Sequence, residues 1–180
     1  METNTKTKWG IDPTHSEISF KVKHLMITNV KGVFKDFSAV IHTSADSYLT
    51  SDVDLTINPS SIDTGVADRD AHLRSADFFD VENFPEMSFK GTSIENAAAG
   101  SYILAGDMTI KGISKLIKLN IEFEGVMKDP WGNEKAGYTI TGVLNRKDWG
   151  LNWNAALETG GFLVSDEVKL SCDVQLFKQS

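Results

Sequence analysis

One stretch of the sequence, SSIDTGVADRDAHLRSADFFD, gathers the side chains that are most capable of chemistry. Asp68, Asp70 and His72 lie close together along the chain, with Arg69 and Arg74 beside them. Carboxylates next to an imidazole could serve as general acid and base, in a hydrolase or isomerase that acts on a lipid-like substrate. The same groups could instead hold a short helix in place, because arginine makes forked contacts with oxygen acceptors.

The catalytic interpretation lacks the rest of an active site. Acid–base catalysis needs a nucleophile or a water site, and a partner that orients the base. The sequence has no nucleophile elbow and no phosphate-binding glycine loop. Aromatic residues follow the charged cluster at once, so we expect a lid or side wall that is polar outside and aromatic inside. Four polar residues are expected to clasp this lid or to contact the polar end of a ligand: Arg69, Asp70, His72 and Arg74.

The composition is typical of a globular protein with one core. The chain has 180 residues, of which 41% are hydrophobic and 24% charged. Its net charge of −7 argues against nucleic-acid binding, which requires a basic surface. No apolar run approaches the ~20 residues of a transmembrane helix. The first residues, METNTKTKWG, lack the apolar segment of a secretory signal, so we expect a cytoplasmic protein, or a periplasmic one if the chain has been processed.

No metal site is expected. The histidines His15, His24, His42 and His72 lie in different segments and form no close ligand pair. The single cysteine, Cys172, excludes an internal disulfide and a cysteine-based zinc site. It alternates in phase with apolar neighbours, which predicts an inert thiol in the interior.

Apolar and polar residues alternate in eight segments, which predicts eight β-strands. In SKLIKLNIEFEGV, for example, Ile117, Leu119 and Ile121 share one face and charged residues occupy the other. All four prolines lie at segment borders, where they interrupt no ladder. The predicted strands are residues 17–24, 30–42, 51–58, 86–94, 102–110, 114–126, 137–145 and 166–177.

The strand pattern predicts a barrel or a sandwich with one helical segment. The helix is expected at roughly residues 67–76, with Asp68 as its cap. A strand over residues 114–126 would be about 40 Å long at ~3.3 Å per residue. Strands of this length would make the interior of an eight-stranded barrel a tunnel, which suits a long, thin, apolar ligand.

Four stretches resemble the YceI-like, or polyisoprenoid-binding, proteins over nearly the whole chain: IDPTHSEISFKVKHLMITNVKGVFKDFS, INPSSIDTGVADRDAHLRSADFFDVENFPEMSFKGTS, GDMTIKGISK and NRKDWGLNWNAALETGGFLVSDEVKL. The resemblance implies an all-β fold, an extended eight-stranded antiparallel lipocalin-like β-barrel with a short helical insertion around residues 67–80. This single domain would span residues 9–178, after a disordered extension of residues 1–8. The resemblance also implies a long apolar pocket for a polyisoprenoid or a similar amphiphilic lipid. Many members of the family are exported.

We therefore expect a lipid-binding protein and not an enzyme. Its partner would be a long-chain isoprenoid or fatty lipid, such as an isoprenoid quinone or prenyl alcohol, which it would carry, store or sense without another cofactor. An apolar tunnel mouth also favours cover by a second copy, as a homodimer. Trp149 and Trp153 would either plug one end of the tunnel or line it with their indole faces. The expected lining residues are Phe20, Val22, Phe34, Leu55, Ile57, Leu73, Phe78, Phe79, Phe84, Phe89, Met108, Ile110, Leu119, Ile121, Trp149 and Trp153.

Overall fold

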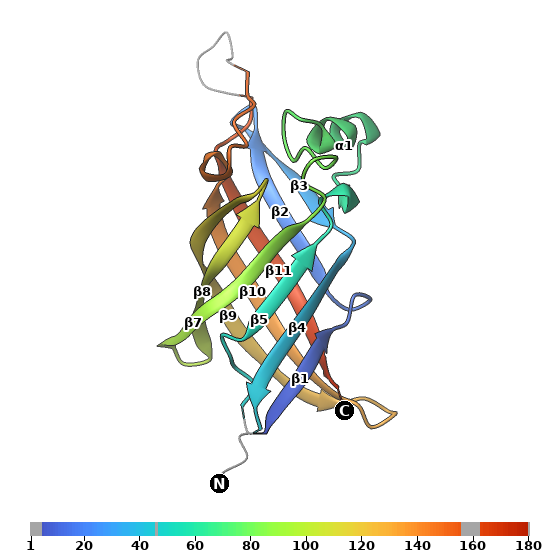
Figure 1. Ribbon diagram of the computed structural model, residues 1–180, viewed down its shortest axis with the longest axis vertical. Coiled ribbons are helices and arrows are strands. Elements are labelled where there is room, and N and C mark those ends of the chain that lie inside the picture. Colours follow the sequence, from blue (N-terminus) through green and yellow to red (C-terminus); the bar gives the residue numbers. More distant parts are fainter. Residues whose placement is uncertain (1–4, 46, 156–162, 180) are drawn as a thin grey trace.

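The computed structural model describes residues 5–45, 47–155 and 163–179. Figure 1 shows a long barrel of tilted strands with the helix α1 (Ala67–Arg74) at one end. In the described part of the chain, no helix is long and apolar enough to cross a membrane. The strands are β1 (Lys6–Ile11), β2 (Glu17–His24), β3 (Thr28–Phe34), β4 (Phe37–Ser44), β5 (Val53–Ile57), β6 (Ile62–Asp63), β7 (Met87–Ala98), β8 (Ser101–Ile110), β9 (Ile113–Lys128), β10 (Glu134–Asn145) and β11 (Glu167–Lys178).

These segments form eight barrel strands, because three of the eight are interrupted. β1 and β2 pair with successive parts of β11, and β4 and β3 pair with β1 and β2 in turn. In the same way, β5 pairs with β4 and β6 pairs with β3. The pairs β1 and β2, β4 and β3, and β5 and β6 therefore each form one interrupted barrel strand. The order β1–β4–β5–β7–β8–β9–β10–β11 closes through the pairing of β1 with β11, and every pairing is antiparallel. The predicted eight-stranded antiparallel barrel with one short helix is confirmed.

The N-terminal end of the barrel differs from the prediction. Residues 6–8, which were expected to be disordered, belong to β1 and pair with β4, while residues 1–4 lie outside the described residues. The lysines and threonines of this stretch show no apolar alternation. Pairing on both sides and the buried indole of Trp9, whose Nε1 donates to Thr43 Oγ1 at 2.9 Å, hold the strand in place.

The predicted strand of residues 30–42 is also interrupted in the structure. β3 ends at Phe34 and β4 begins at Phe37. The two residues between them bond to Ser61, the last residue of the 3-10 helix η1 (Pro59–Ser61). The Lys35 amide donates to the carbonyl of Ser61 at 3.3 Å, and the Asp36 amide donates to the Oγ of Ser61 at 3.0 Å.

The helix α1 confirms the predicted insertion, but its N-terminus is built differently. The cap residue is Val66, whose side chain makes no capping hydrogen bond, and Asp68 lies inside the first turn. Acidic residues in the first turn and basic residues in the last turn complement the helix dipole.

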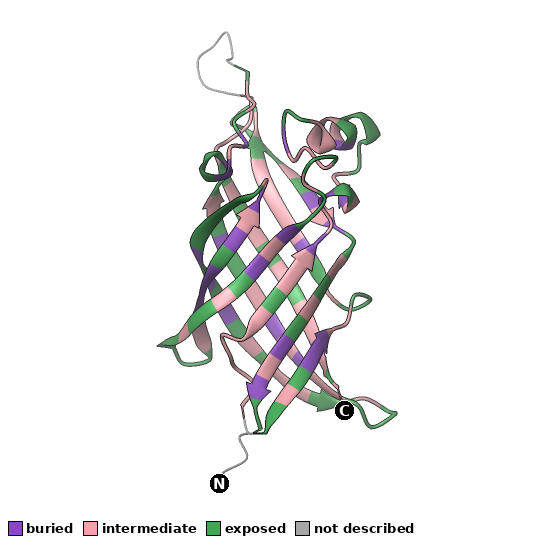
Figure 2. Ribbon diagram, in the orientation of Figure 1, coloured by how far each residue is buried: buried purple, intermediate pink, exposed green. Residues whose placement is uncertain are grey.

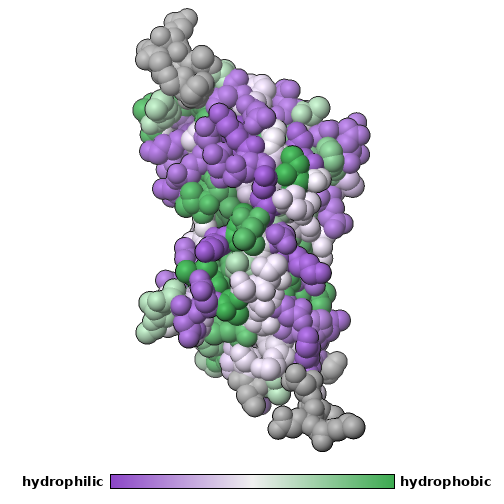
Figure 3. Space-filling model, turned by 60° about the vertical axis from the view of Figure 1, so that its left-hand side comes forward, coloured by the Kyte–Doolittle hydropathy of each residue, from purple (hydrophilic) through white to green (hydrophobic). Residues whose placement is uncertain are grey.

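The core lies inside the barrel and follows the alternation of the strands. On β9, Ile117, Leu119 and Ile121 are buried while Lys118 and Asn120 are exposed. Figure 2 shows the same banding of buried and exposed residues on several strands. The outer wall is less uniform: in Figure 3 hydrophobic atoms gather near the middle of one face, whereas its upper part is largely hydrophilic.

Candidate functional site

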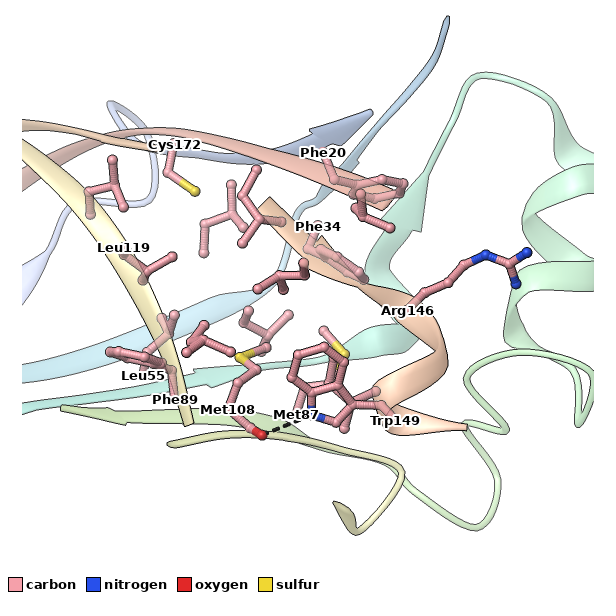
Figure 4. A pocket seen from close by; sticks show the side chains of 18 of the residues that line it. Phe20, Phe34, Leu55, Met87, Phe89, Met108, Leu119, Arg146, Trp149 and Cys172 are labelled. Atoms are coloured by element: carbon pink, nitrogen blue, oxygen red, sulfur yellow. Dashed lines mark hydrogen bonds between the residues drawn. The ribbon is translucent and has the colours of Figure 1, made fainter. Parts of the chain in front are cut away.

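A cavity of about 560 Å³ lies inside the barrel. Every described strand except β6 contributes side chains to its wall. Figure 4 shows the side chains of Phe20, Leu119 and Cys172 pointing into it from different parts of the wall. The volume falls within the ~300–1,000 Å³ typical of small-molecule pockets. The wall is almost entirely apolar, so a ligand would be bound chiefly by burial of its own apolar surface.

Fifteen of the sixteen residues expected to line the tunnel do line the cavity. They are Phe20, Val22, Phe34, Leu55, Ile57, Leu73, Phe78, Phe79, Phe89, Met108, Ile110, Leu119, Ile121, Trp149 and Trp153. The exception is Phe84, which the structure places outside the cavity. Its ring packs against Gly112 in the turn between β8 and β9. Phe84 follows a stretch of loop whose direction no alternation defines, which is why its side chain could not be placed from the sequence.

The single thiol belongs to the cavity wall. Cys172 pairs with Ile18 of β2 and Ile140 of β10, and its sulfur faces the cavity, as its phase in the sequence predicted. Burial raises the pKa of the thiol from 9.0 to about 11. The group is therefore neutral near pH 7 and behaves as part of the apolar wall.

Aromatic rings close the end of the cavity that is far from α1. Tyr48, in the loop after β4, stacks on Phe123 with centroids 5.7 Å apart and meets the edge of Trp9 at 5.9 Å. The Tyr138 hydroxyl donates to the carbonyl of Tyr48, and the Tyr48 hydroxyl donates to Glu134 at 2.8 Å. The bond to Glu134 raises the pKa of Tyr48, and burial raises that of Tyr138. Both phenols therefore stay neutral and hold the loop across the barrel.

The opposite end of the cavity, beside α1, is its mouth. Lys23 and Asp68 are the exposed residues of the described lining, and both belong to this end. Most of the other polar lining residues lie here as well: His24, Thr64, Arg69, His72 and Arg146. An amphiphilic ligand would thus meet polar groups at one end and apolar walls along the rest of its length.

The polar cluster of α1 converges on Thr64, just before the helix. The buried carboxylate of Asp70 accepts from the Thr64 amide at 2.9 Å and from its hydroxyl at 2.5 Å. Arg69 donates from Nε to Thr64 Oγ1 at 2.7 Å and from Nη2 to the Thr64 carbonyl at 2.6 Å. Arg74 adds bonds to the carbonyls of Ser60 and Ile62. These are contacts of a polar clasp, and of its four predicted members Asp70 and Arg74 do not line the cavity.

Aromatic rings form the inner side of this lid. His72 makes edge contacts with Phe78 at 5.1 Å and with Trp153 at 4.7 Å, and Phe79 meets Phe34 of the barrel wall at 5.8 Å. The segment therefore packs against the barrel wall through its aromatic side, and its role as a lid stays a prediction.

Trp149 combines the two roles that the sequence left open. It ends the 3-10 helix η2 (Arg146–Trp149) with only 2% of its surface exposed, and its Nε1 donates to the carbonyl of Met108 at 3.0 Å. The indole is anchored like a plug and also forms part of the cavity wall. Trp153 also lines the cavity and contacts the lid through His72.

Arg146 was not anticipated from the sequence. Only 4% of it is exposed; the residue belongs to the cavity lining, and its guanidinium points away from the apolar side chains toward α1 (Figure 4). It donates to the carbonyls of Leu151, Trp153 and Ser165 at 2.5, 2.8 and 2.9 Å, and burial lowers its pKa. In the sequence NRKDWG this arginine is indistinguishable from an exposed turn residue, because its acceptors are backbone carbonyls that carry no side-chain signal.

The structure does not assemble the acid–histidine cluster that the catalytic alternative requires. Asp70 is engaged by Thr64, Asp68 lies exposed at the mouth, and the His72 ring bonds instead to Asp77, with Nε2 and Oδ2 2.9 Å apart. Within the described residues, no serine, threonine or cysteine side chain bonds to that ring. The two side chains of this pair are 37% and 56% exposed, so the structure holds a solvent-accessible acid–histidine pair other than the predicted cluster.

Fold and cavity together define a lipocalin-like barrel that encloses an apolar site. Known proteins agree: the YceI-like domain family matches residues 9–176. A UPF0312 protein of Staphylococcus epidermidis, SERP2314, is 40% identical over 170 residues, which cover 94% of this chain and 96% of that protein. The chain belongs to the YceI-like family.

Solved structures show the same architecture. The YCEI protein of Campylobacter jejuni is 35% identical, with a TM-score of 0.76 over 89% of this chain and 91% of that one. A polyisoprenoid binding domain from Saccharophagus degradans, implicated in plant cell wall breakdown, has a TM-score of 0.66 over 96% of this chain and 98% of that one. Its identity is 16%, so this likeness concerns the fold alone.

Proposed function

We propose that the protein binds a long-chain amphiphilic lipid inside the barrel, a polyisoprenoid such as an isoprenoid quinone or a prenyl alcohol. The observation that carries the proposal is the apolar cavity, which is closed by aromatic rings at one end and bordered by polar groups at the other. This shape and polarity suit a molecule with one polar end and a long hydrocarbon chain. The polyisoprenoid binding domain with the same fold supports this choice of lipid class.

Burial of the hydrocarbon chain would provide the binding free energy. Each methylene transferred from water contributes about 0.8 kcal/mol, so a few isoprene units suffice without an ion pair. The head group would lie at the mouth, where Arg69 and His72 line the cavity. Carriage, storage and sensing all require that the lipid enters and leaves by this end, past the lid.

Native mass spectrometry of the purified protein, followed by solvent extraction, tests the proposal. We expect one added mass per chain, and an extracted molecule with a long apolar chain and one polar end. Protein stripped of lipid should also take up a fluorescent prenyl alcohol in a saturable manner. Protein that carries no lipid and fails to bind the prenyl probe would overturn the proposal.

A further inference from the structure

The turn between β2 and β3 presents three apolar side chains to solvent. Leu25, Met26 and Ile27 are 40%, 61% and 78% exposed. Larger apolar side chains are normally covered in a globular protein when they are consecutive, because their exposure opposes folding. An exposed apolar run of this kind is typical of a surface that contacts a membrane or an apolar surface of another protein.

The backbone of this turn is strained as well. Leu25 and Met26 have φ angles of 52° and 62°, and the Ile27 amide donates to the carbonyl of His24 at 3.2 Å. Positive φ at both central residues is the geometry that asparagine and glycine adopt most easily in tight hairpins. Bulky residues are disfavoured there. Neither folding nor solubility explains leucine and methionine at these two positions.

Lysines without ion pairs lie on the strands next to the turn. Lys21 of β2 is paired with Lys31 of β3 and with Lys169 of β11, so that three like charges form a row across adjacent strands. Lys23 lies nearer the tip. None of the four forms an ion pair with a described residue, and Lys21, Lys31 and Lys169 stand directly opposite one another. Like charges directly opposite each other destabilise a sheet, so this basic row is unexplained by the fold.

The turn is attached to the mouth of the cavity. His24, the last residue of β2, lines the cavity and forms a bridge with Val164. The Leu25 amide donates to the carbonyl of Leu163, which also lines the cavity. A surface that received the tip of this hairpin would therefore lie directly beside the mouth.

We propose that the β2–β3 hairpin docks the protein on an anionic lipid bilayer. Leu25, Met26 and Ile27 insert between the head groups, and the lysine row faces the lipid phosphates. Apolar anchors next to basic residues are the combination that binds peripheral proteins to anionic membranes. A bilayer is favoured over a protein partner because three side chains offer far less than the ~800 Å² per partner of a stable protein interface.

Charge also sets the orientation of the docked protein. The chain has a net charge of −7. Asp68 and Asp77 of this end belong to α1 and the turn after it, whereas on the β11 side Asp166 is paired with Lys147 and only Glu167 opens the strand. An anionic surface would attract the β2, β3 and β11 side and repel the α1 side. The lid would then remain free to move while the mouth lies against the bilayer. The use of docking for lipid exchange rests on the proposed function, whereas docking itself does not.

Vesicle flotation tests the proposal directly. Parent protein is mixed with vesicles of phosphatidylcholine alone or with phosphatidylglycerol added, at low and high salt. The tip variant carries Leu25→Asn, Met26→Gly and Ile27→Ser, which removes the apolar groups and supplies residues suited to the turn. The charge variant carries Lys21→Gln, Lys31→Gln and Lys169→Gln. The control carries Met127→Ser and Trp131→Ser in the hairpin between β9 and β10, where both residues are also exposed.

We expect the parent to float with anionic vesicles, and the tip variant to lose at least tenfold in affinity while its thermal unfolding midpoint stays equal or rises. The charge variant should lose affinity and its salt dependence, and the control should behave like the parent. Docking by this hairpin would be overturned if the parent does not bind the vesicles or if the tip variant binds as tightly as the parent. It would also be overturned if the control loses as much affinity as the tip variant. Prenyl-probe binding without vesicles is measured in parallel: its absence in the parent would refute the proposed function and leave the docking result standing.

Discussion

At the scale of single residues, successive side chains on β9 face the cavity and the solvent in turn. Leu119 points into the cavity with 9% exposed, and Asn120 points outward. We expect Leu119→Asp to abolish lipid binding, because the ligand would have to desolvate a carboxylate, and to lower the free energy of unfolding by several kcal/mol. Asn120→Asp introduces the same group outside and should leave both unchanged. Lipid extraction and urea denaturation give the two readouts.

The same pair of variants can contradict the assignment of the cavity as the binding site. A folded Leu119→Asp protein that retains as much lipid as the parent would show that the chain of the lipid lies elsewhere. Leu119→Trp provides a neutral check, because it fills the cavity without adding charge.

The Cys172 thiol predicts a specific pH dependence. With a pKa of about 11, only about one thiol in a thousand is ionised at pH 8, so iodoacetamide should modify it slowly in the folded protein. Between pH 9.0 and about 11 the thiol ionises in the unfolded chain but not in the folded one. Its contribution to stability is therefore complete below pH 9.0 and declines as the pH rises through this window. Alkylation rates and urea denaturation over pH 8–11 measure both effects, with Cys172→Ser as the reference.

Much of the cavity wall could be predicted from residue types, and its two ends could not. Alternation places side chains such as Phe20 and Leu119 because a strand turns successive residues to opposite faces. Tyr48 lies in a loop and Arg146 begins the short 3-10 helix η2, where no alternation relates sequence to direction. The role of Tyr48 comes from contacts such as that with Phe123, and the role of Arg146 from bonds to backbone carbonyls.

At the scale of elements, α1 and the segment after it should control the escape of the lipid. Arg69→Ala removes two bonds to Thr64, and Phe79→Ala removes the ring that meets Phe34. We expect both to raise the dissociation rate of a fluorescent prenyl probe more than they lower its association rate, because the lid governs escape. Stopped-flow mixing measures both rates.

Glu82→Ala serves as the control for the lid variants, because Glu82 is exposed on the same segment. It should leave the dissociation rate unchanged. If Arg69→Ala and Phe79→Ala release the probe no faster than the parent does, the segment is not a lid. The His72–Asp77 pair would then have to be tested for catalysis.

Arg146 should hold together the segments on either side of residues 156–162. Arg146→Met removes the donor from three carbonyls that are buried or partly buried, so we expect a loss of about 3–5 kcal/mol in the free energy of unfolding. The neighbouring Lys147→Met removes an exposed ion pair with Asp166, which should change stability by less than about 1 kcal/mol. Urea denaturation of both variants measures the difference. Equal effects would show that the carbonyl bonds of Arg146 contribute little.

The sequence patterns predicted that most of the strands exist, but they did not predict the order in which the strands pair. Long alternating segments such as β9 and β11 were recognisable because a half-buried strand repeats every two residues. β1 has only Trp9 and Ile11 as apolar residues, and its pairing depends on the closure of the barrel. Closure is a property of the whole sheet, so local sequence does not reveal it.

At the scale of the whole molecule, the barrel has one aromatic end and one polar end, joined by an apolar wall. In our proposals, the polar end carries both the lid and the hairpin that meets the membrane. The other end is closed by aromatic rings from a loop and three strands, of which Tyr48 and Tyr138 line the cavity. The length available to a ligand is therefore set by the distance between the lid and Tyr48.

Tyr48→Ala should lengthen the cavity and shift the preference toward longer lipids. Loss of the ring opens space beside Phe123 and Trp9, and each further methylene that enters contributes about 0.8 kcal/mol. Two more buried methylenes would raise the affinity roughly 15-fold. Competition between farnesol, geranylgeraniol and solanesol for the prenyl probe measures the preference. Tyr102→Ala is the matched control, because Tyr102 packs against the core but does not line the cavity. If Tyr48→Ala binds the three alcohols in the same order as the parent and the control, Tyr48 does not set the length of the ligand.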